Sequence, residues 1–275
     1  LQTTPQRQVL GSSKKMISKL FDLSGRVALI TGGNGGIGLG MAEGLASQGC
    51  EVSIWGTNAD KNAKALETLQ QYGPRVSALK CNVADQQAVE ACFKQTLETH
   101  GRVDGCFANA GISGRPTQFD QMEKAEWTRI MEVNLDGVFH TFRCAAEHMR
   151  VRSQAGDPFG RLISTASLAA VSGQARGEHY AATKGGLIAM NKALAVEYAR
   201  HNVTAHTILP GWIETYMTEQ TFSSDKFVSN VMPRIPMRRW GQPEDFAGIA
   251  VYIMSSASGY HTSETFLIDG GYANF

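Results

Sequence analysis

Two side chains four residues apart, Tyr180 and Lys184, have the types and the spacing needed to move a proton. In a helix, positions i and i+4 lie on one face, so the phenol and the ammonium would lie close together. A nearby positive charge favours the phenolate and lowers the phenol pKa from its free value of about 10. The pair would then supply a proton donor or acceptor near neutral pH. Tyr-x-x-x-Lys is common by chance, and the structural alternative is a packing tyrosine beside a solvated lysine.

A serine thirteen residues before Tyr180 gives this pair a third partner. Ser167 ends the run Ser164-Thr165-Ala166-Ser167, which follows an apolar stretch typical of a strand. A serine in such a loop is usually only a turn former. One strand-end loop separates Ser167 from the helix of Tyr180, so both hydroxyls can meet one substrate oxygen.

The element that must position a cofactor near these groups is the stretch from Arg26 to Gly44. An apolar run typical of a strand leads into a glycine-rich turn and then into a helical pattern. This arrangement places backbone N–H groups and a positive helix end against a phosphate. The spacing is T-G-x-x-x-G-x-G, with Gly32, Gly36 and Gly38 in the fixed places. No Lys followed by Ser or Thr comes after the last glycine, which excludes the phosphate loop of nucleotide hydrolases.

The rest of the chain alternates apolar strands with helical patterns of ten or more residues, which indicates parallel βαβ units. We therefore predict a three-layer, doubly wound (Rossmann) α/β fold with a mainly parallel seven-stranded sheet. In such a sheet, ligands bind beyond the carboxyl ends of the strands. Strands are expected at 27–30, 51–55, 75–80, 104–108, 159–165, 203–209 and 264–268, and helices at 60–72, 86–100, 124–149 (interrupted near Asn134), 178–201, 215–232 and 243–255.

The residues after the second and third strands bear on the adenosine end of a dinucleotide. Gly56 and Thr57 stand where an acidic residue would bond the ribose 2′-hydroxyl and repel a 2′-phosphate. The missing carboxylate permits NADP(H), although no arginine is placed to clamp a phosphate at Thr57 or Gly35, and we slightly favour NADP(H). The run 82–85 would hold the adenine edge, or Asp85 simply caps the next helix.

After the fourth strand, Asn109-Ala110-Gly111 supplies small residues on which a cofactor can lie flat. Asn109 would either contact the cofactor or bond only to neighbouring backbone. Both roles stay open on the sequence alone.

Taken together, these motifs resemble those of the short-chain dehydrogenase/reductase family, from Phe21 to the C-terminus. Each motif alone is weak, but the ordered set is specific. The matching residues are Thr31-Gly32-x-x-x-Gly36-x-Gly38, Asn109-Ala110-Gly111, Asn134, Ser167, Tyr180-x-x-x-Lys184, Pro210-Gly211 and Asp269-Gly270.

The resemblance implies a catalytic role for four residues. Tyr180 would transfer a proton to or from the substrate oxygen, and Ser167 would orient that oxygen. Lys184 would hold the nicotinamide ribose and lower the pKa of Tyr180. Asn134 would bind a water that links Lys184 to solvent, or it is only a helix-kinking asparagine bonded to its own backbone.

The resemblance also implies a set of cofactor contacts, in which the segment after the sixth strand embraces the nicotinamide. Two departures from the family pattern, Asn82 for Asp and Ala108 for Asn, leave catalysis intact. The expected cofactor-binding residues are Gly32, Asn34, Gly35, Gly36, Ile37, Gly38, Gly56, Thr57, Asn58, Asn82, Val83, Asn109, Ala110, Gly111, Tyr180, Lys184, Pro210, Gly211, Ile213 and Thr215.

Substrate contacts are expected from two segments on either side of the nicotinamide. The first, within 212–239, is polar and rich in Met, and we predict a mobile lid with Phe222 as a further wall residue. The second, 173–179, precedes Tyr180, and its Arg176, Glu178 and His179 either bind a polar or anionic group or are merely solvated. The expected substrate contacts are Ser167, Gln174, His179, Trp212 and Met217.

Composition limits the classes of function. The 275 residues are 43% hydrophobic with a net charge of +1, which favours one large domain and gives no sign of a nucleic-acid or membrane partner. Five cysteines without a C-x-x-C pair indicate buried free thiols in a reducing, cytoplasmic compartment. Residues 1–20 are expected to be an extension or tag remnant, outside a single domain at 21–275. By the family resemblance, a homotetramer or homodimer is expected.

The sequence thus predicts an NAD(P)-dependent oxidoreductase that interconverts a secondary alcohol and a ketone, with a small-molecule substrate. The alternative is a silent dinucleotide-sensing regulator of the same fold, which loss of Tyr180 or Lys184 would have favoured. A hydrolase is excluded because no G-x-S-x-G occurs. No H-E-x-x-H or paired cysteines indicate a metal.

Overall fold

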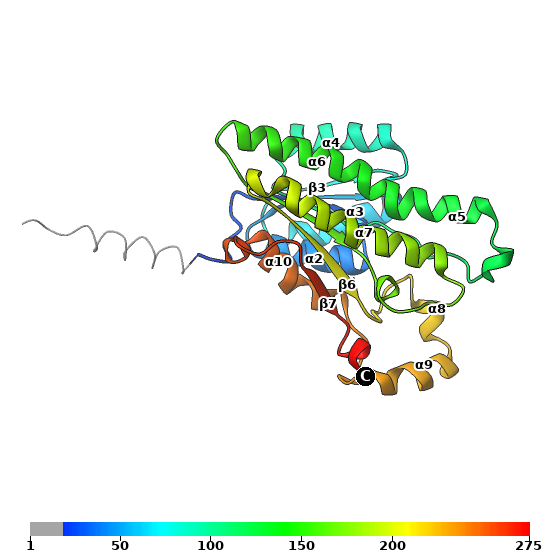
Figure 1. The fold of residues 1–275 in the computed structure, drawn as a ribbon. Helices are drawn as coiled ribbons and strands as arrows, with labels where there is room; N and C mark the ends of the chain where they lie inside the picture. Colours follow the sequence, from blue (N-terminus) through cyan, green and yellow to red (C-terminus); the bar gives the residue numbers. More distant parts are fainter. Residues whose placement is uncertain (1–18) are drawn as a thin grey trace, which may run out of the picture.

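The computed structural model describes residues 19–275, and most of the extension expected at 1–20 lies outside this range. A seven-stranded sheet with the order β3-β2-β1-β4-β5-β6-β7 forms the middle layer, and every neighbouring pair of strands is parallel (Figure 1). The predicted fold class is confirmed. The strands are β1 Val27–Thr31, β2 Glu51–Gly56, β3 Val76–Lys80, β4 Gly105–Ala108, β5 Gly160–Thr165, β6 Val203–Pro210 and β7 Thr265–Ile268.

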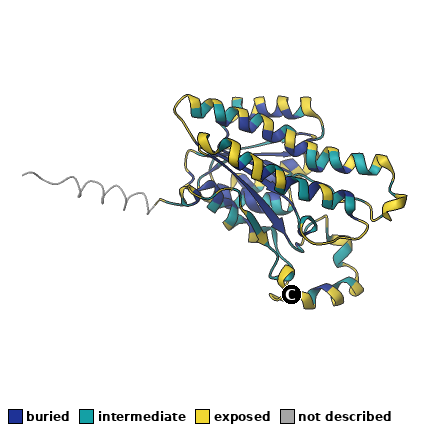
Figure 2. Ribbon diagram, in the orientation of Figure 1, coloured by how far each residue is buried: buried dark blue, intermediate teal, exposed yellow. Residues whose placement is uncertain are grey.

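Helices cover both faces of the sheet and bury separate apolar cores (Figure 2). One core joins α2, α3 and α10 to the sheet, and the other joins α4, α6 and α7 to it. Continuous burial explains why the central strands read as apolar runs, as parallel strands between two helical layers must. The helices are α2 Gly36–Ser47, α3 Ala59–Gln70, α4 Gln86–His100, α5 Lys124–Met131, α6 Gly137–Gln154, α7 Glu178–Tyr198, α8 Glu219–Phe222, α9 Asp225–Val231 and α10 Ala247–Met254.

The strand order reverses between β1 and β4, which is the point where a doubly wound sheet opens a crevice. The glycine-rich turn follows β1 and Asn109 follows β4, so both lie at this reversal. Ser167 follows β5, and Pro210 ends β6 beside it. Parallel strands end at the same edge, so residues far apart in sequence meet there.

The interruption predicted near Asn134 is a π-helical turn, Glu132–Asp136, between α5 and α6. The Asn134 amide donates to the Ile112 carbonyl at 2.9 Å, and its oxygen accepts from the Ile112 N–H at 2.8 Å. Asn134 therefore pairs with the chain after β4 and not with its own helix. Single π-helical turns of this kind often mark functional sites.

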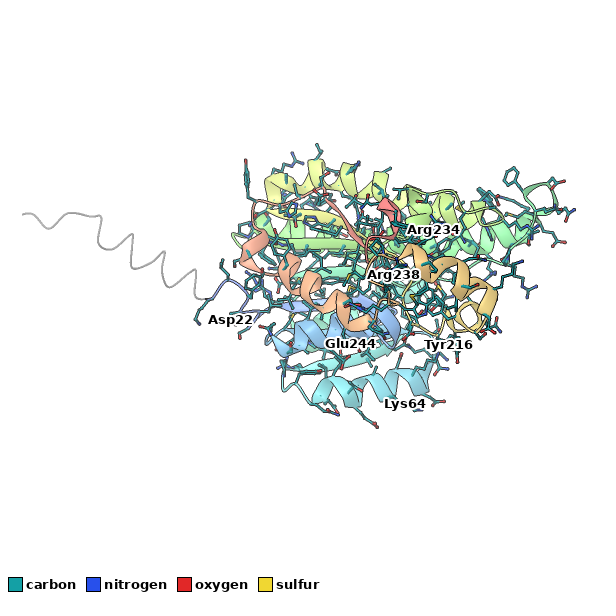
Figure 3. All side chains as sticks on the ribbon, turned by 90° about the horizontal axis from the view of Figure 1, so that it is seen from below. Asp22, Lys64, Tyr216, Arg234, Arg238 and Glu244 are labelled. Carbon is teal, nitrogen blue, oxygen red and sulfur yellow. The ribbon has the colours of Figure 1, made fainter. Side chains whose placement is uncertain are left out.

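A long excursion leaves the fold after β6 and contains the short helices α8 and α9. Figure 3 labels Tyr216 and Arg234 in this segment. The Arg234 guanidinium lies 4.6 Å from the centre of the Tyr272 ring, so the excursion also contacts the C-terminal residues.

The five cysteines are all free thiols, four of them buried and Cys144 half-buried, as the sequence predicted. Within residues 19–275, no helix has the length and apolar character to cross a bilayer. The same residues contain no group of three side chains suited to hold a metal ion.

Candidate active site

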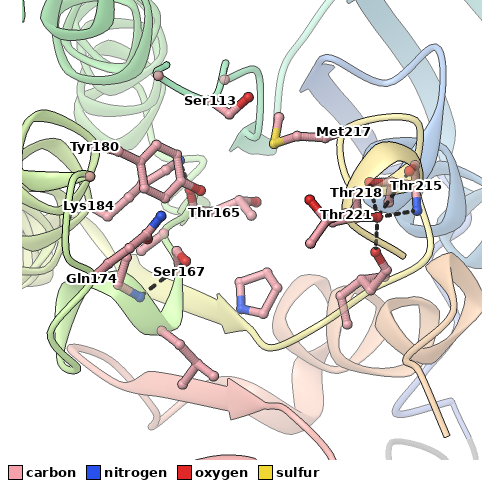
Figure 4. Close-up of a pocket in the computed structure, with 18 of the residues that line it drawn as sticks. Ser113, Thr165, Ser167, Gln174, Tyr180, Lys184, Thr215, Met217, Thr218 and Thr221 are labelled. Carbon is pink, nitrogen blue, oxygen red and sulfur yellow. Dashed lines mark hydrogen bonds between the residues drawn. The ribbon is translucent and has the colours of Figure 1, made fainter. Parts of the chain in front are cut away.

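A cleft of about 1800 Å³ runs along the carboxyl ends of the strands. Pockets for drug-sized ligands measure about 300–1,000 Å³, so this cleft has room for a dinucleotide together with a second molecule. The glycine turn, the chain after β4, the start of α7 and the excursion after β6 all border it. Figure 4 shows Tyr180, Lys184 and Ser167 on one wall and, across the open space, Thr215, Met217, Thr218 and Thr221.

Three of the four residues predicted to be catalytic, Ser167, Tyr180 and Lys184, lie together on the first wall. The Lys184 ammonium donates to the Thr165 carbonyl at 2.8 Å and lies 5.5 Å from the centre of the Tyr180 ring. Ser167 caps a short 3₁₀ turn, where its hydroxyl accepts from the Ala169 N–H. The helical spacing and the strand-end loop therefore bring these side chains to one part of the cleft.

Burial is the main cause of the pKa shifts of Tyr180 and Lys184 on this wall. Burial raises the pKa of Tyr180, while the neighbouring Ser167 hydroxyl acts in the lowering direction. Burial also lowers the pKa of Lys184 to about 8, because its ammonium is removed from water. The predicted lowering of the phenol pKa by Lys184 is therefore not found in the protein alone. The ammonium is itself desolvated and is directed at Thr165.

Asn134 and Lys184 approach the same small space beside Gly111. A Cβ placed on Gly111 would lie 3.3 Å from the Asn134 oxygen and 3.4 Å from the Lys184 ammonium. Asn134 is fully buried and does not border the cleft. It fixes the chain after β4 and faces the region where Lys184 ends.

The glycine turn fits the phosphates of a dinucleotide. Gly35 caps α2 without a side-chain hydrogen bond, and the first turn of α2 has no acid, so its N–H groups are free to meet an anion. Gly32 and Gly36 have φ of +64° and +51°, which only glycine adopts without strain. A Cβ on Gly38 would lie 2.3 Å from the Gly32 carbonyl, so this position needs glycine for close packing.

Two roles were predicted for Asn109, and the structure shows the one in which its side chain bonds to neighbouring backbone. Its amide donates to the carbonyls of Thr31 and Gly32, at 3.2 Å and 3.3 Å. It thereby holds the end of β4 to the start of the glycine turn while it borders the cleft. A contact with the cofactor remains a prediction.

The adenosine end of the cleft differs in part from the sequence prediction. The Asn34 side chain donates to Asn62 at 2.6 Å and lies over Gly56, where a Cβ would be 2.1 Å from its nitrogen. Gly56 and Thr57 are not among the residues that border the cleft. Asn58 instead caps α3.

Residues after β3 also have structural partners. The Asn82 side chain accepts from the Ala84 N–H, and Val83 packs against Gly137. Neither Asn82 nor Val83 borders the cleft, whereas Lys61 in the first turn of α3 does. Sequence reasoning missed Lys61, although a lysine one turn beyond the second strand was visible.

The two ends of the excursion after β6 are joined to each other by backbone hydrogen bonds, and we call this junction its pinned base. Ile213 pairs with Gly241 in an isolated parallel bridge, and Glu214 N–H donates to the Gly241 carbonyl at 2.9 Å. Thr215 packs on the glycine turn, where a Cβ on Gly36 would lie 3.1 Å from its methyl group. The chain thus leaves and returns at one point, with residues 214–240 between.

Aromatic stacking orders this excursion. Phe222 stacks on Trp240 with ring centres 4.2 Å apart, and Trp212 meets Phe227 edge-on at 4.8 Å. Trp212 and Met217 border the cleft, as predicted, but Phe222 does not. The expected wall role of Phe222 is therefore wrong, because its ring is used inside the excursion.

Gln174, Arg176 and His179, from the segment before Tyr180, also border the cleft. Figure 4 shows Gln174 beside Ser167, on the wall that faces the excursion. His179 is 1% exposed, and both its ring nitrogens are covered and have no hydrogen bond within residues 19–275. A Cβ added to Gly114 would lie only 1.8 Å from His179 Nε2, so the imidazole fills the space beside this glycine. The side chain therefore supports the loop after β4, and its direct contact with a substrate remains a prediction.

Glu126 joins the elements around this wall. Its carboxylate accepts two hydrogen bonds from Arg129 and one from the Arg115 N–H, and lies 3.8 Å from His179 Nε2. The bonds from Arg129 and from the Arg115 N–H lower the pKa of Glu126 to about 2. The carboxylate is therefore ionised at neutral pH and ties α5, the loop after β4 and the start of α7 together.

The fold and the site define an α/β protein of the dinucleotide-dependent dehydrogenase class. A family model described as enoyl-(acyl carrier protein) reductase matches residues 32–273. The chain is 34% identical over 250 residues to a 3-oxoacyl-[acyl-carrier-protein] reductase of Chlamydia pneumoniae, covering 90% of this chain and 97% of that protein. It is 32% identical over 257 residues to 2-dehydro-3-deoxy-D-gluconate 5-dehydrogenase of Escherichia coli, covering 94% and 99%.

Among solved structures, a gluconate 5-dehydrogenase from Burkholderia cenocepacia in complex with NADP and tartrate matches with a TM-score of 0.87 and 32% identity, covering 94% of this chain and 98% of that one. The chain belongs to the short-chain dehydrogenase/reductase family. It is an NAD(P)-dependent oxidoreductase that interconverts a secondary alcohol and a ketone.

Proposed function

We propose that Tyr180 is the general acid and base of this enzyme, with Ser167, Lys184 and Asn134 as its partners. The observation that carries the proposal is the Lys184 ammonium, held by Thr165 beside the Tyr180 ring in the wall of the cleft. The bound cofactor supplies a hydride to a ketone, or accepts one from an alcohol. Tyr180 gives its hydroxyl proton to the carbonyl oxygen during reduction and takes it back during oxidation.

The other residues of the wall serve this proton transfer. Ser167 donates a hydrogen bond to the same oxygen and orients it. Lys184 binds the nicotinamide ribose, and its charge, together with the oxidised nicotinamide, counteracts the burial that raises the phenol pKa. Asn134 keeps the chain beside Gly111 in place, so that a water can meet Lys184 there.

The cofactor lies, in this proposal, with its pyrophosphate on the free N–H groups of α2 and its nicotinamide at Pro210–Thr215. The bare helix end and the packing of Thr215 on Gly36, which brings the segment after β6 to the glycine turn, support this placement. NADP(H) is the preferred form, because no carboxylate follows β2 at Gly56. The proposed contacts at Gly56, Thr57, Asn58, Asn82 and Val83 require the adenosine to reach past the present border of the cleft.

For the substrate, we propose a hydroxy acid or keto acid of the sugar-acid type. Arg115, Arg176 and Arg234 border the cleft, and their guanidinium groups have no ion pair within residues 19–275. Guanidinium groups bind carboxylates with two parallel hydrogen bonds. Two of the relatives named above act on gluconate-type acids, and one of them binds tartrate.

Arg176 is the strongest candidate to hold the substrate carboxylate. Its φ is +65°, a strained value for a residue with a side chain. Its N–H donates to the Glu178 carboxylate at 3.1 Å, and its carbonyl accepts from the Thr117 N–H at 3.3 Å. These two bonds hold a strained backbone at the cleft, just before Tyr180.

The test is a panel of 5-keto-gluconate, an uncharged ketose and an acetoacetyl thioester, each with NADPH and NADH. The sugar acid is expected to have the highest kcat/KM. Arg176→Gly, which keeps the left-handed backbone free of strain, should raise the KM for the acid alone, while Arg150→Ala on α6 should change nothing. A preference for the thioester would favour a carrier-bound 3-oxoacyl substrate, as in the Chlamydia relative.

We further propose that the lid predicted around 212–239 consists of residues 214–240, between the bridged Ile213 and Gly241, and that the chain forms a cytoplasmic homotetramer or homodimer. The lid proposal is supported by the pinned base at Ile213 and Gly241. Exposed apolar side chains on α6 and α7, including Phe139 and Val196, support an assembly through these helices. Light scattering on the purified protein and on Val196→Asp tests the assembly.

A further inference from the structure

Lys61 occupies a position at the cleft that its role in α3 does not explain. It lies in the first turn of α3, where its N–H donates to the Asn58 cap at 2.9 Å. Its side chain borders the cleft beside Asn34 and Gly35 of the glycine turn. The backbone of Lys61 is thus fixed, and its flexible side chain reaches the border of the cleft.

The ammonium of Lys61 has an aromatic partner but no acidic one. It lies 4.2 Å from the centre of the Tyr216 ring, a cation–π distance. No ion pair joins it to a carboxylate in the part of the chain that the structure describes, including its neighbour Asp60. Tyr216 belongs to the lid and is 82% exposed. Figure 3 shows it on the side of the lid toward α3, the helix that also carries Lys64.

The surroundings favour an anion at this point. Where β2 ends, Gly56 has no side chain, and the Asn34 amide covers it. The first turn of α2 has no acid, and Asp60 is the one acid in the first turn of α3. A phosphate at this point could bind the Lys61 ammonium and the Asn34 amide, and Asp60 is the one acid in the first turns of the two helices that it would face.

We propose that Lys61 binds the 2′-phosphate of NADP(H), and that its contact with Tyr216 couples this choice of cofactor to the lid. The inference rests on the proposed function in taking NADP(H) as the cofactor. An ammonium has three donors and can hold a phosphate while one side remains on an aromatic ring. A bound phosphate fixes Lys61, which in turn fixes Tyr216 and the adjoining Thr215 and Met217 at the substrate. NADH lacks the phosphate, so it does not fix Lys61 against Tyr216 in this way.

The coupling has a thermodynamic consequence. If NADPH holds the lid in its substrate-binding arrangement better than NADH does, substrate must bind more tightly with NADPH. The difference must vanish when either Lys61 or Tyr216 is removed. A wall residue that merely touched the substrate would act equally with both cofactors.

The first experiment measures the affinity of Lys61→Ala for NADPH and NADH by fluorescence, with no substrate present. NADPH affinity should fall about 10- to 100-fold, as expected for a lost hydrogen bond to a charged group, and NADH affinity should change less than about twofold. Lys64→Ala, on the same helix, is the matched control and should change neither. An equal loss of affinity for both cofactors, or no loss of affinity for either, overturns the proposed role of Lys61. Failure of the unmodified protein to bind either cofactor would instead contradict the proposed function.

The second experiment measures substrate KM for Tyr216→Leu with saturating NADPH and with saturating NADH. KM with NADPH should rise roughly threefold to tenfold, the range expected for a lost cation–π contact, while KM with NADH and the affinity for NADPH itself stay near their original values. Tyr216→Phe keeps the ring and should keep the coupling. An equal rise of KM with both cofactors would show that Tyr216 is only a wall residue and would overturn the coupling.

Discussion

The two walls of the cleft are built in opposite ways. The catalytic wall rests on β5, which is buried along its whole length, and Lys184 there is 3% exposed. The facing wall is the lid, in which α9 buries only Val231 and Met217 is 47% exposed. Side chains locked by the core hold a fixed reaction geometry, whereas the lid depends on its own aromatic cluster. The contrast assigns the chemistry to the first wall and gives the second wall a share, alongside Arg176, in the choice of substrate.

The hydrogen bonds of the two walls show the same difference. Asn191 of α7 donates to the Ser164 hydroxyl at 2.7 Å and to Thr207 at 2.9 Å, which ties the catalytic helix to β5 and β6. In the lid, the Thr218 hydroxyl serves its own segment, donating to the Ile213 carbonyl at 2.6 Å. The lid is thus held partly by its own hydrogen bonds and partly by the C-terminal residues, where the Met237 N–H donates to the Gly270 carbonyl at 3.2 Å.

The largest expected effect belongs to the catalytic wall. Tyr180→Phe removes only the hydroxyl and should lower kcat by about 10²- to 10⁴-fold, because that hydroxyl is the proposed general acid and base. Reduced nicotinamide absorbance measures the rate, and fluorescence titration should show unchanged cofactor binding. Turnover within tenfold of the original protein would exclude Tyr180 as the acid and base.

The next largest effect is expected in the glycine turn, whose close packing is proposed to form the phosphate site. Gly38→Ala places a Cβ 2.3 Å from the Gly32 carbonyl and 2.6 Å from the Asn109 amide, so the glycine turn must shift. A lost phosphate hydrogen bond costs about 1.5–3 kcal/mol, so affinity for NADPH should fall at least tenfold. Gly248→Ala, a glycine with no neighbour within 4 Å of its Cβ, is the matched control. Unchanged affinity in Gly38→Ala would show that the turn is not a tight phosphate site.

A smaller effect concerns how burial of the catalytic wall alters stability with pH. The folded-state pKa of Lys184, about 8, lies below the 10.5 of an unfolded lysine. Between these pH values the unfolded chain binds more protons, so stability rises with pH. Relative to Lys184→Met, the protein should gain up to about 3 kcal/mol from pH 8 to 10.5 in urea unfolding. If the difference in unfolding free energy between the protein and Lys184→Met did not change with pH, Lys184 would be solvated in the folded protein.

The smallest effect belongs to the lid. Phe222→Ala removes the stack on Trp240 and should raise substrate KM roughly threefold to tenfold, the worth of one aromatic pair. The melting temperature should hardly change, because the lid lies outside both apolar cores. A large loss of stability would show that the lid is part of the core.

The sequence predicted the fold and the catalytic wall because these depend on short-range rules. Strand and helix periods fix the layers, and the i, i+4 spacing of Tyr180 and Lys184 fixes their shared face. The π-helical turn at Asn134 was visible as a break in a helical pattern. The titration of this wall was not predictable, since it depends on how far each group is buried.

The lid and the adenosine end were predicted less well because long-range contacts decide them. The position of an aromatic residue says little about its direction, and Phe222 turned into the lid. Asn34 borders the cleft where a cofactor was expected, but its bond to Asn62 was not predicted because it depends on the packing of α3. The contact between Lys61 and Tyr216 joins segments more than 150 residues apart and leaves no local pattern.

The division of labour between the walls is tested most directly by the ratio of kcat/KM for two substrates, a sugar acid and an uncharged ketose. We expect Tyr180→Phe to lower both values by the same factor and leave the ratio unchanged. Met217→Ala, on the lid, should change the ratio and leave the hydride-transfer rate of the bound acid nearly intact. If Met217→Ala instead lowered both values equally, or Tyr180→Phe spared one substrate, the account would be contradicted.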